Sequence, residues 1–198
     1  MADDNGAPAR RVLVAEDEAI IRLDLVEMLR EEGYDVVAEA ENGQVAVEKA
    51  TELRPDLVIM DVKMPVRNGL DAATEIARER IAPVVMLTAF SQREFVEKAR
   101  EAGAMAYLVK PFTKSDLVPA IEIAVSRFGE LQQLEREVTD LTERLETRKL
   151  VDRAKGLLMA KQNLTEPDAF RWIQRTAMDR RTSMKTIAHV VIDTLGKD

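Results

Sequence analysis

The strongest constraint on the fold is an alternation of short apolar segments with amphipathic segments in the N-terminal part of the chain. The apolar segments are rich in Val, Leu, Ile and Met, which favours buried strands, and apolar residues recur at helical spacing between them. This order predicts an α/β doubly wound (βα)5 domain, in which helices cover both faces of a five-stranded parallel sheet. The expected strands span residues 11–15, 35–39, 57–60, 84–87 and 105–109, and the expected helices span 18–32, 44–53, 69–80 and 92–102, with a further helix from near Ser115.

The composition excludes several classes of functional site. The 198-residue chain has no Cys and one His, so thiol nucleophiles, thiolate or histidine metal sites and a Ser-His-Asp triad are not expected. We expect that histidine, His189, to be a surface or packing residue. Aromatic residues make up 4% of the chain, which argues against base-stacking platforms. No apolar run is long enough to span a membrane, and residues 1–9 are too polar and acidic for a signal peptide, so we expect a cytoplasmic protein with no membrane partner.

Polar side chains follow the expected strands at the ends where parallel sheets bind ligands. Glu16 and Asp17 come after the first strand, and Asp61 comes after the third. Thr88 follows the fourth strand, and Lys110 follows the fifth. Each of them alone could be a helix cap, a turn residue or a solvated charge. Together they would place three carboxylates, a hydroxyl group and an ammonium group around one crevice.

Such a cluster supports one kind of chemistry. Three neighbouring carboxylates repel one another and need a cation, and Mg²⁺ prefers carboxylates, a carbonyl and waters. One carboxylate can then attack a phosphoryl group to form an aspartyl-phosphate. The metal and the ammonium group would neutralise the phosphoryl oxygens, and the hydroxyl group could hydrogen-bond to them. No Gly-x-Gly-x-x-Gly follows the first strand and no Walker-type loop is present, so nucleotide-binding motifs are not indicated.

The same residues resemble the signature of two-component response-regulator receiver domains. The resemblance covers residues 9–127 and rests on four motifs, Glu16-Asp17, Asp61-Val-Lys-Met-Pro65, Thr88-Ala89 and Lys110-Pro111-Phe112. It implies that Asp61 is the phosphoacceptor and that a sensor histidine kinase is the partner. It further implies that Thr88 and Lys110 contact the phosphoryl group. The Mg²⁺ ligands that it implies are Glu16, Asp17, Asp61 and the backbone carbonyl of Lys63.

Three further expectations follow from this resemblance. Tyr107 occupies the aromatic switch position, although a half-buried strand aromatic would look the same in the sequence. The Lys110–Pro111 peptide bond is expected to be cis. Lys63 departs from the small or polar residue that is common two positions after the phosphoacceptor, and its side chain could alter the lifetime of the phosphoryl group.

The connector, residues 128–146, carries a heptad pattern. Apolar residues follow 3-4-3-4 spacing, which is typical of the a and d positions of a coiled coil: Leu131, Leu134, Val138, Leu141 and Leu145. The pattern predicts a helical linker that could pair two copies of the chain. Extension of the last receiver helix onto the neighbouring domain fits the same residues equally well. Gly129 is a candidate hinge, because Gly costs a helix about 1 kcal/mol relative to Ala.

The tail, residues 147–195, is expected to be a small all-α domain of three helices. The first spans residues 147–162, Thr165 caps the second, and Thr182 or Ser183 caps the third. Residues 147–198 carry 11 Lys and Arg against 6 Asp and Glu, a balance of +5, whereas residues 1–125 carry 15 against 24, a balance of −9. A basic tail behind an acidic domain favours a polyanionic partner for the tail.

A second resemblance concerns this tail. The segment Arg153-Ala-Lys-Gly-Leu-Leu-Met159, with Ala169-Phe170, Ala177 and Ile187-Ala188, is similar to the ANTAR domain, the RNA-binding output module of transcription antiterminators. The resemblance implies that structured hairpins in nascent transcripts are bound, and it suits a homodimer that is joined by a coiled coil. Basic side chains are the candidates for contacts with phosphates or loop bases: Lys155, Arg153, Arg175, Arg180 and Arg181.

The leading hypothesis is a response regulator that is phosphorylated on Asp61 and then binds RNA to prevent termination. A first alternative is a DNA-binding response regulator, but the third tail helix is largely apolar on two faces and poorly suited to a groove. A second alternative is a phosphorelay or protein-interaction regulator whose helical tail only dimerises. An enzymatic output is not expected, because the tail has no nucleophile–base pair.

Overall fold

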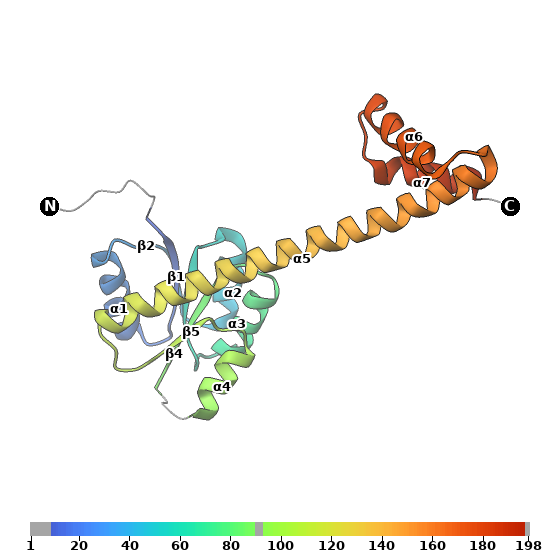
Figure 1. Cartoon of the computed structure of the whole chain (residues 1–198). Helices are drawn as coiled ribbons and strands as arrows, with labels where there is room; N and C mark the ends of the chain where they lie inside the picture. The colour runs from blue at the N-terminus through green and yellow to red at the C-terminus, as the bar shows by residue number, and fades with distance from the viewer. Residues whose placement is uncertain (1–8, 90–92, 197–198) are drawn as a thin grey trace. The chain divides into compact units, whose positions relative to one another are not determined.

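The computed structural model describes residues 9–89 and 93–196 of the chain. The chain divides into two compact units, an N-terminal unit of residues 1–132 and a C-terminal unit of residues 133–198. The division falls inside the segment that the sequence marks as a connector. One helix, α5 (Lys114–Gln162), contributes to both units (Figure 1). Within the described ranges, no helix has an apolar stretch long enough to cross a bilayer.

The N-terminal unit is built on the parallel sheet that the sequence predicts. Neighbouring strands pair in the order β2-β1-β3-β4-β5, and every pair is parallel. The chain leaves β1 toward β2 on one side and reaches β3 on the other, so the carboxyl ends of β1 and β3 border the position where open α/β sheets bind ligands. The strands are β1 (Arg11–Ala15), β2 (Asp35–Ala40), β3 (Leu57–Asp61), β4 (Val84–Thr88) and β5 (Ala106–Val109).

Helices cover both faces of this sheet (Figure 1). Val12 and Val14 of β1 pack with α1 and the first part of α5, whereas Leu13 and Ala15 pack on the other face with α2, α3 and α4. Because successive side chains of a strand alternate between faces, one continuous apolar strand serves both cores. The helices are α1 (Ala19–Glu31), α2 (Gly43–Leu53), α3 (Gly69–Arg78) and α4 (Arg93–Glu101).

Helix ends differ slightly from those expected. The helix expected over 69–80 ends at Arg78, and the helix expected from residue 92 is described from Arg93, since residue 92 lies outside the described ranges. The side chain of Asn68 accepts the N–H of Asp71 at 2.9 Å, which places the start of α3 at the next residue.

The connector and the first tail helix form one element, which corrects the expectation of a separate helix over 147–162. Helix α5 has 49 residues and continues through Gly129, so this glycine is not a break. Once a helix is nucleated, each further residue adds a hydrogen bond, and one Gly does not offset that gain. The last receiver helix therefore continues through the linker into the C-terminal unit, and pairing of two copies through the linker stays a prediction. The apolar residues at the a and d positions of the connector, from Leu131 to Leu145, are called the seam below. The seam is not covered in the single chain, because its residues 134, 138, 141 and 145 are 58–62% exposed.

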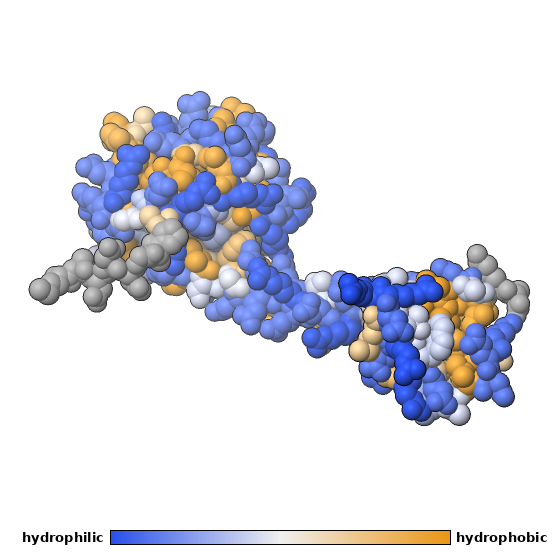
Figure 2. Space-filling view, turned by 90° about the horizontal axis from the view of Figure 1, so that it is seen from above, coloured by the Kyte–Doolittle hydropathy of each residue, from blue (hydrophilic) through white to orange (hydrophobic). Residues whose placement is uncertain are grey.

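The C-terminal unit closes around the end of α5 with two shorter helices, α6 (Glu166–Asp179) and α7 (Met184–Leu195). The side chain of Thr165 caps α6, as predicted, and Ser183 rather than Thr182 caps α7. Each helix contributes one small apolar stripe to the core: Val151, Ala154 and Leu158 of α5, Ala169, Ile173 and Ala177 of α6, and Ile187, Ala188 and Val191 of α7. Other hydrophobic side chains remain at the surface of both units (Figure 2).

The turn between β3 and α3 holds a β-branched residue in an unusual backbone conformation. Val66 has a φ of +64°, and its side chain is 86% exposed. The N–H of Arg67 donates to the carbonyl of Pro65 at 2.6 Å, which closes a three-residue turn around Val66. A positive φ costs such a residue about 1–3 kcal/mol, because its branched Cβ crowds the backbone.

We expect Val66→Gly to raise the free energy of unfolding by about 1 kcal/mol, because Gly has no Cβ and adopts a positive φ freely. The gain is smaller than the full strain, because Gly also gains freedom in the unfolded chain. Urea unfolding measures the difference. Val66→Ala is the matched control, which keeps a Cβ and should gain less. A Val66→Gly protein less stable than the parent would mean that the turn is not strained.

Candidate functional site

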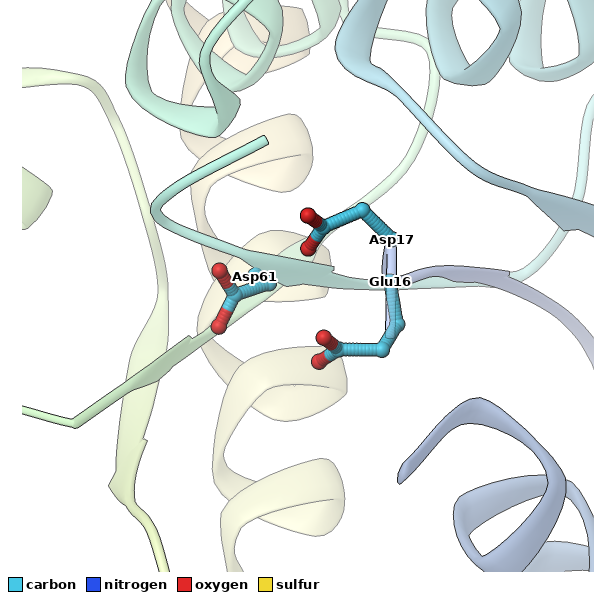
Figure 3. A group of neighbouring side chains, drawn as sticks. All are labelled: Glu16, Asp17 and Asp61. Carbon is cyan, nitrogen blue, oxygen red and sulfur yellow. The ribbon is translucent and has the colours of Figure 1, made fainter. Parts of the chain in front are cut away.

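The carboxyl ends of β1 and β3 bring three carboxylates together. Glu16 and Asp17 follow β1 directly, and Asp61 is the last residue of β3. One oxygen from each carboxylate lies within 4.8 Å of the others, and Figure 3 shows the three carboxylate groups next to one another. The cluster of three carboxylates that the sequence predicts is therefore observed. It follows from the pairing of β1 with β3, which places the ends of these two strands side by side.

Lys110 supplies the positive charge at this cluster. Its Nζ lies 2.6 Å from Glu16 Oε2 and 2.6 Å from Asp61 Oδ1. Lys110 follows β5, which pairs with β4 and not with β3, so its long side chain crosses the end of β4 to reach Asp61. The N–H of Lys110 donates to the carbonyl of Thr88 at 2.8 Å, which fixes the backbone position from which the side chain of Lys110 extends. The Lys110–Pro111 bond is cis, as expected.

Burial and charge shift the protonation equilibria of this pair. Burial is the largest cause that raises the pKa of Glu16, and the nearby charge of Asp61 adds to it, although Lys110 opposes both. Burial would lower the pKa of Lys110, but hydrogen bonds and attraction from Asp61 and Glu16 outweigh it and leave that pKa raised. Lys110 is therefore a protonated counter-ion for the carboxylates near neutral pH.

Neither aspartate serves as a helix cap. The N-cap of α1 is Glu18, without a side-chain cap, and the N-cap of α3 is Asn68. Among residues 9–89 and 93–196, the exposed Asp17 carboxylate has no hydrogen bond or ion pair. Asp61, by contrast, is 7% exposed and accepts the N–H of Lys63 at 2.7 Å. Both carboxylates therefore line the crevice, with that of Asp61 fixed by hydrogen bonding and that of Asp17 unconstrained.

A small hollow of about 230 Å³ opens at this cluster. Thr88, at the end of β4, lines it and is 4% exposed. Lys63 lines the hollow as well. The role of its backbone carbonyl as a metal ligand stays a prediction. The remaining lining residues are Asp17, Glu18, Asp61, Val62, Ala89 and Lys110.

The donor set fits a hard divalent cation. Mg²⁺ binds carboxylate oxygens in an octahedron and keeps several waters. Each carboxylate oxygen of buried Glu16 and Asp61 already has a partner, but an ionised carboxylate oxygen has more than one lone pair and can also bind a cation. Exposed Asp17 adds a carboxylate on the open side of the cluster. The cluster can therefore hold a cation beside a carboxylate that is positioned as a nucleophile.

Gly69 is a residue of the site that the sequence did not reveal. A Cβ on Gly69 would lie 1.8 Å from the carbonyl oxygen of Asp61, so only glycine lets α3 start this close to β3. The N–H of Gly69 donates to the carbonyl of Val62 at 2.9 Å. The sequence predicts that a helix begins at residue 69, but the close approach of its backbone to Asp61 is visible only in three dimensions.

Tyr107 lies on β5 and does not line the hollow at Asp61. Its side chain is 46% exposed and borders a second hollow, of about 560 Å³, that β5 forms with α4 and α5. Pro119 and Ile123 of α5 line the same hollow. This placement suits a strand aromatic that packs beside α5, and its role as a switch stays a prediction.

The basic candidates in the C-terminal unit are not equivalent. Lys155 Nζ lies 2.8 Å from Asp152 Oδ1 and 2.8 Å from Glu166 Oε1, and its side chain is 15% exposed. Both carboxylates raise the pKa of Lys155, and the ion pair with Glu166 joins α5 to α6. The other four candidates are exposed and make no side-chain ion pair within the described part of the chain: Arg153, Arg175, Arg180 and Arg181. Lys155 is thus the least available for RNA.

Comparisons with known proteins account for both units. Residues 12–122 match the response regulator receiver domain, and residues 139–192 match the ANTAR domain. The chain is 70% identical over 194 residues to the transcriptional regulatory protein PdtaR of Mycobacterium tuberculosis, which covers 98% of this chain and 95% of that protein. It is 42% identical to the chemotaxis protein CheY of Thermotoga maritima, over 57% of this chain and 94% of CheY.

Solved structures agree for the N-terminal unit. The response regulator domain of Thermotoga maritima CheB superposes with a TM-score of 0.55 and 30% identity, over 60% of this chain and 97% of that one. A DNA-binding response regulator of the LuxR family from Staphylococcus aureus gives a TM-score of 0.56 and 28% identity, over 59% of this chain and 98% of that one.

We expect Asp17→Ala to weaken Mg²⁺ binding about tenfold or more, because loss even of a residue that supports a metal ligand costs about 10–100-fold. Titration calorimetry measures the affinity. Asp24→Ala, which removes an exposed carboxylate of α1 outside the cluster, should leave the affinity unchanged. Equal affinities for the parent and Asp17→Ala would exclude Asp17 as a metal ligand.

Proposed function

The chain belongs to the response regulators that join a receiver domain to an ANTAR domain, and we propose that it is phosphorylated on Asp61 by a sensor histidine kinase and then controls transcription antitermination by binding RNA. The observation that carries this proposal is the convergence of Glu16, Asp17, Asp61 and Lys110 at the carboxyl end of the sheet. This arrangement favours attack by a carboxylate on a phosphoryl group over any hydrolytic or redox chemistry.

The proposed transfer uses the residues in distinct roles. A carboxylate oxygen of Asp61 attacks the phosphorus of a phosphohistidine on the kinase, so that an O–P bond forms as the P–N bond breaks and the imidazole leaves. Lys110, 2.6 Å from Asp61 Oδ1, is placed to hold a phosphoryl oxygen. The hydroxyl of Thr88 lines the same hollow and can donate to another. Mg²⁺, held by Glu16, Asp17 and Asp61, would supply charge neutralisation.

RNA as the ligand of the C-terminal unit is supported by its family and its charge. The ANTAR match covers residues 139–192, and the exposed arginines there offer donors to phosphates. Duplex DNA is the weaker candidate, because Ile187, Ala188 and Val191 of α7 are buried in the core of the unit. The exposed residues of α7 include none of the Arg, Asn or Gln side chains that make bidentate contacts with bases: Thr186, His189, Val190, Asp193 and Thr194.

Coupling between the two activities is proposed to pass through α5. Its first part packs in the receiver core through Leu117 and Ile121, and the same helix carries the exposed seam. Phosphorylation would draw Thr88 toward the phosphoryl group and reorient Tyr107 beside α5. If that change favours pairing of two seams, two weak RNA contacts combine by effective concentration. A homodimer is therefore part of the proposal.

We expect Asp61→Asn to abolish incorporation of label from acetyl phosphate, because Asn keeps the shape of the side chain but is not a nucleophile. Circular dichroism should show an unchanged fold. The matched control, Asp24→Asn on the exposed face of α1, should be labelled like the parent. Full labelling of Asp61→Asn would place the phosphoacceptor elsewhere.

We expect the double variant Leu134→Lys and Leu141→Lys to lose the phosphorylation-dependent gain in RNA affinity, since charges at d positions oppose pairing of the seam. Labelling of Asp61 should be unaffected, and sedimentation should give a monomer with and without phosphodonor. Gln133→Lys and Thr139→Lys add the same charge on α5 outside the seam and serve as the control. A double seam variant that still binds RNA tightly only when phosphorylated would exclude seam pairing as the switch.

A further inference from the structure

The outward face of α6 carries the only tryptophan of the chain. Ala169, Ile173 and Ala177 turn into the core of the C-terminal unit, so the opposite face of this amphipathic helix would be expected to be polar. Instead, Trp172 is 40% exposed and Met178 is 73% exposed. Exposed apolar residues are common, so the exposure of Trp172 gains meaning only from the side chains beside it.

Basic side chains flank this tryptophan. Arg171, Trp172 and Arg175 share the outward surface of α6 with Met178. Residues three or four apart on a helix are neighbours, so Trp172 and Arg175 stand side by side. Arg171 is held by Asp168, with its Nη2 2.8 Å from Asp168 Oδ1.

Arg175, unlike Arg171, has a guanidinium group that is available to bind a ligand. Within the described residues it makes no hydrogen bond or ion pair through its side chain, although Asp179 lies one turn further along the helix. An indole face beside an uncommitted guanidinium matches one nucleotide of a single strand, whose base stacks and whose phosphate takes the cation. Such a surface is chemically unlike a purely basic patch, which would recognise phosphates alone.

We propose that Trp172 is a stacking platform for an unpaired base of an RNA loop and that Arg175 binds the adjacent phosphate. This inference rests on the proposed RNA-binding function and deepens it, since it assigns the loop rather than the stem to α6. The low aromatic content of the chain argued against such a platform, but one exposed ring at a suitable place is sufficient. The net positive charge of the C-terminal residues supports a nucleic acid over an uncharged apolar partner.

The first test uses the intrinsic fluorescence of Trp172, which is free of interference because the chain has one Trp. The full-length phosphorylated protein is titrated with a pool of stem-loop RNAs that have randomised unpaired loops. The reference ligand is the same stem closed into a continuous duplex of equal length. Stacking should quench the emission with the stem-loop pool, at the concentrations where anisotropy of labelled RNA reports binding, and not with the duplex. Binding of the pool without any change in emission would overturn the proposal.

The second test compares aromatic residues of matched exposure on one helix. Trp172→Leu should weaken binding of the stem-loop pool about 5–150-fold, the equivalent of about 1–3 kcal/mol per stacked base. Trp172→Phe should retain most of the affinity. Phe170→Leu is the control, because Phe170 is 41% exposed but lines a hollow beside Lys155 instead of the surface around Trp172. Arg175→Gln should lower the slope of log affinity against log salt by about one.

The outcomes separate this inference from the function on which it rests. If the parent binds the stem-loop pool and Trp172→Leu binds it equally well, the platform is excluded while RNA binding stands. If the parent binds neither RNA, both the platform and the proposed RNA-binding function fail. If Trp172→Leu and Phe170→Leu lose affinity equally, the loss reflects packing of α6, and the platform is excluded.

Discussion

Repulsion among three carboxylates is the constraint on which the N-terminal unit depends. Glu16 and Asp61 are buried at the ends of adjacent strands, and the ion pairs of Lys110 with both of them offset the cost of burying like charges. Because Lys110 comes from the far side of β4, this compensation requires the whole order β1-β3-β4-β5. The site therefore depends on the order of the strands, and the ammonium group of Lys110 links Asp61 directly to the end of β5.

Much of the fold could be predicted from the sequence, because its determinants are local. Short apolar runs with turns between them define the strands, and polar residues at the ends of four of the five strands define the crevice. What could not be predicted depends on long-range contacts. The ion pair of Lys155 with Glu166 joins residues on two helices and removes Lys155 from the basic surface. The approach of Gly69 to Asp61 is likewise a tertiary contact that leaves no periodic pattern.

Helix boundaries show a second limit of sequence analysis. Gly129 weakens a helix locally, but the continuity of α5 depends on the residues on both sides of it and on their packing in two cores. Trp172 shows a third limit. A composition of few aromatic residues describes the chain as a whole, whereas function depends on where one ring is exposed and on what lies beside it. The exposure of Trp172 is a property of the folded unit, because it depends on which residues of α6 face the core.

The short length of the seam on α5 has a geometric consequence. A stripe with a strict seven-residue repeat drifts by about 20° per heptad around a straight helix, so sustained contact between two helices normally demands that they wind around each other. From Leu131 to Leu145 there are two heptads, over which the drift is about 40°. Side chains of the size of leucine span that angle without any superhelical winding. In the proposed homodimer, two such helices would therefore meet and part as straight rods, which would make their contact more easily reversible than that of a long zipper.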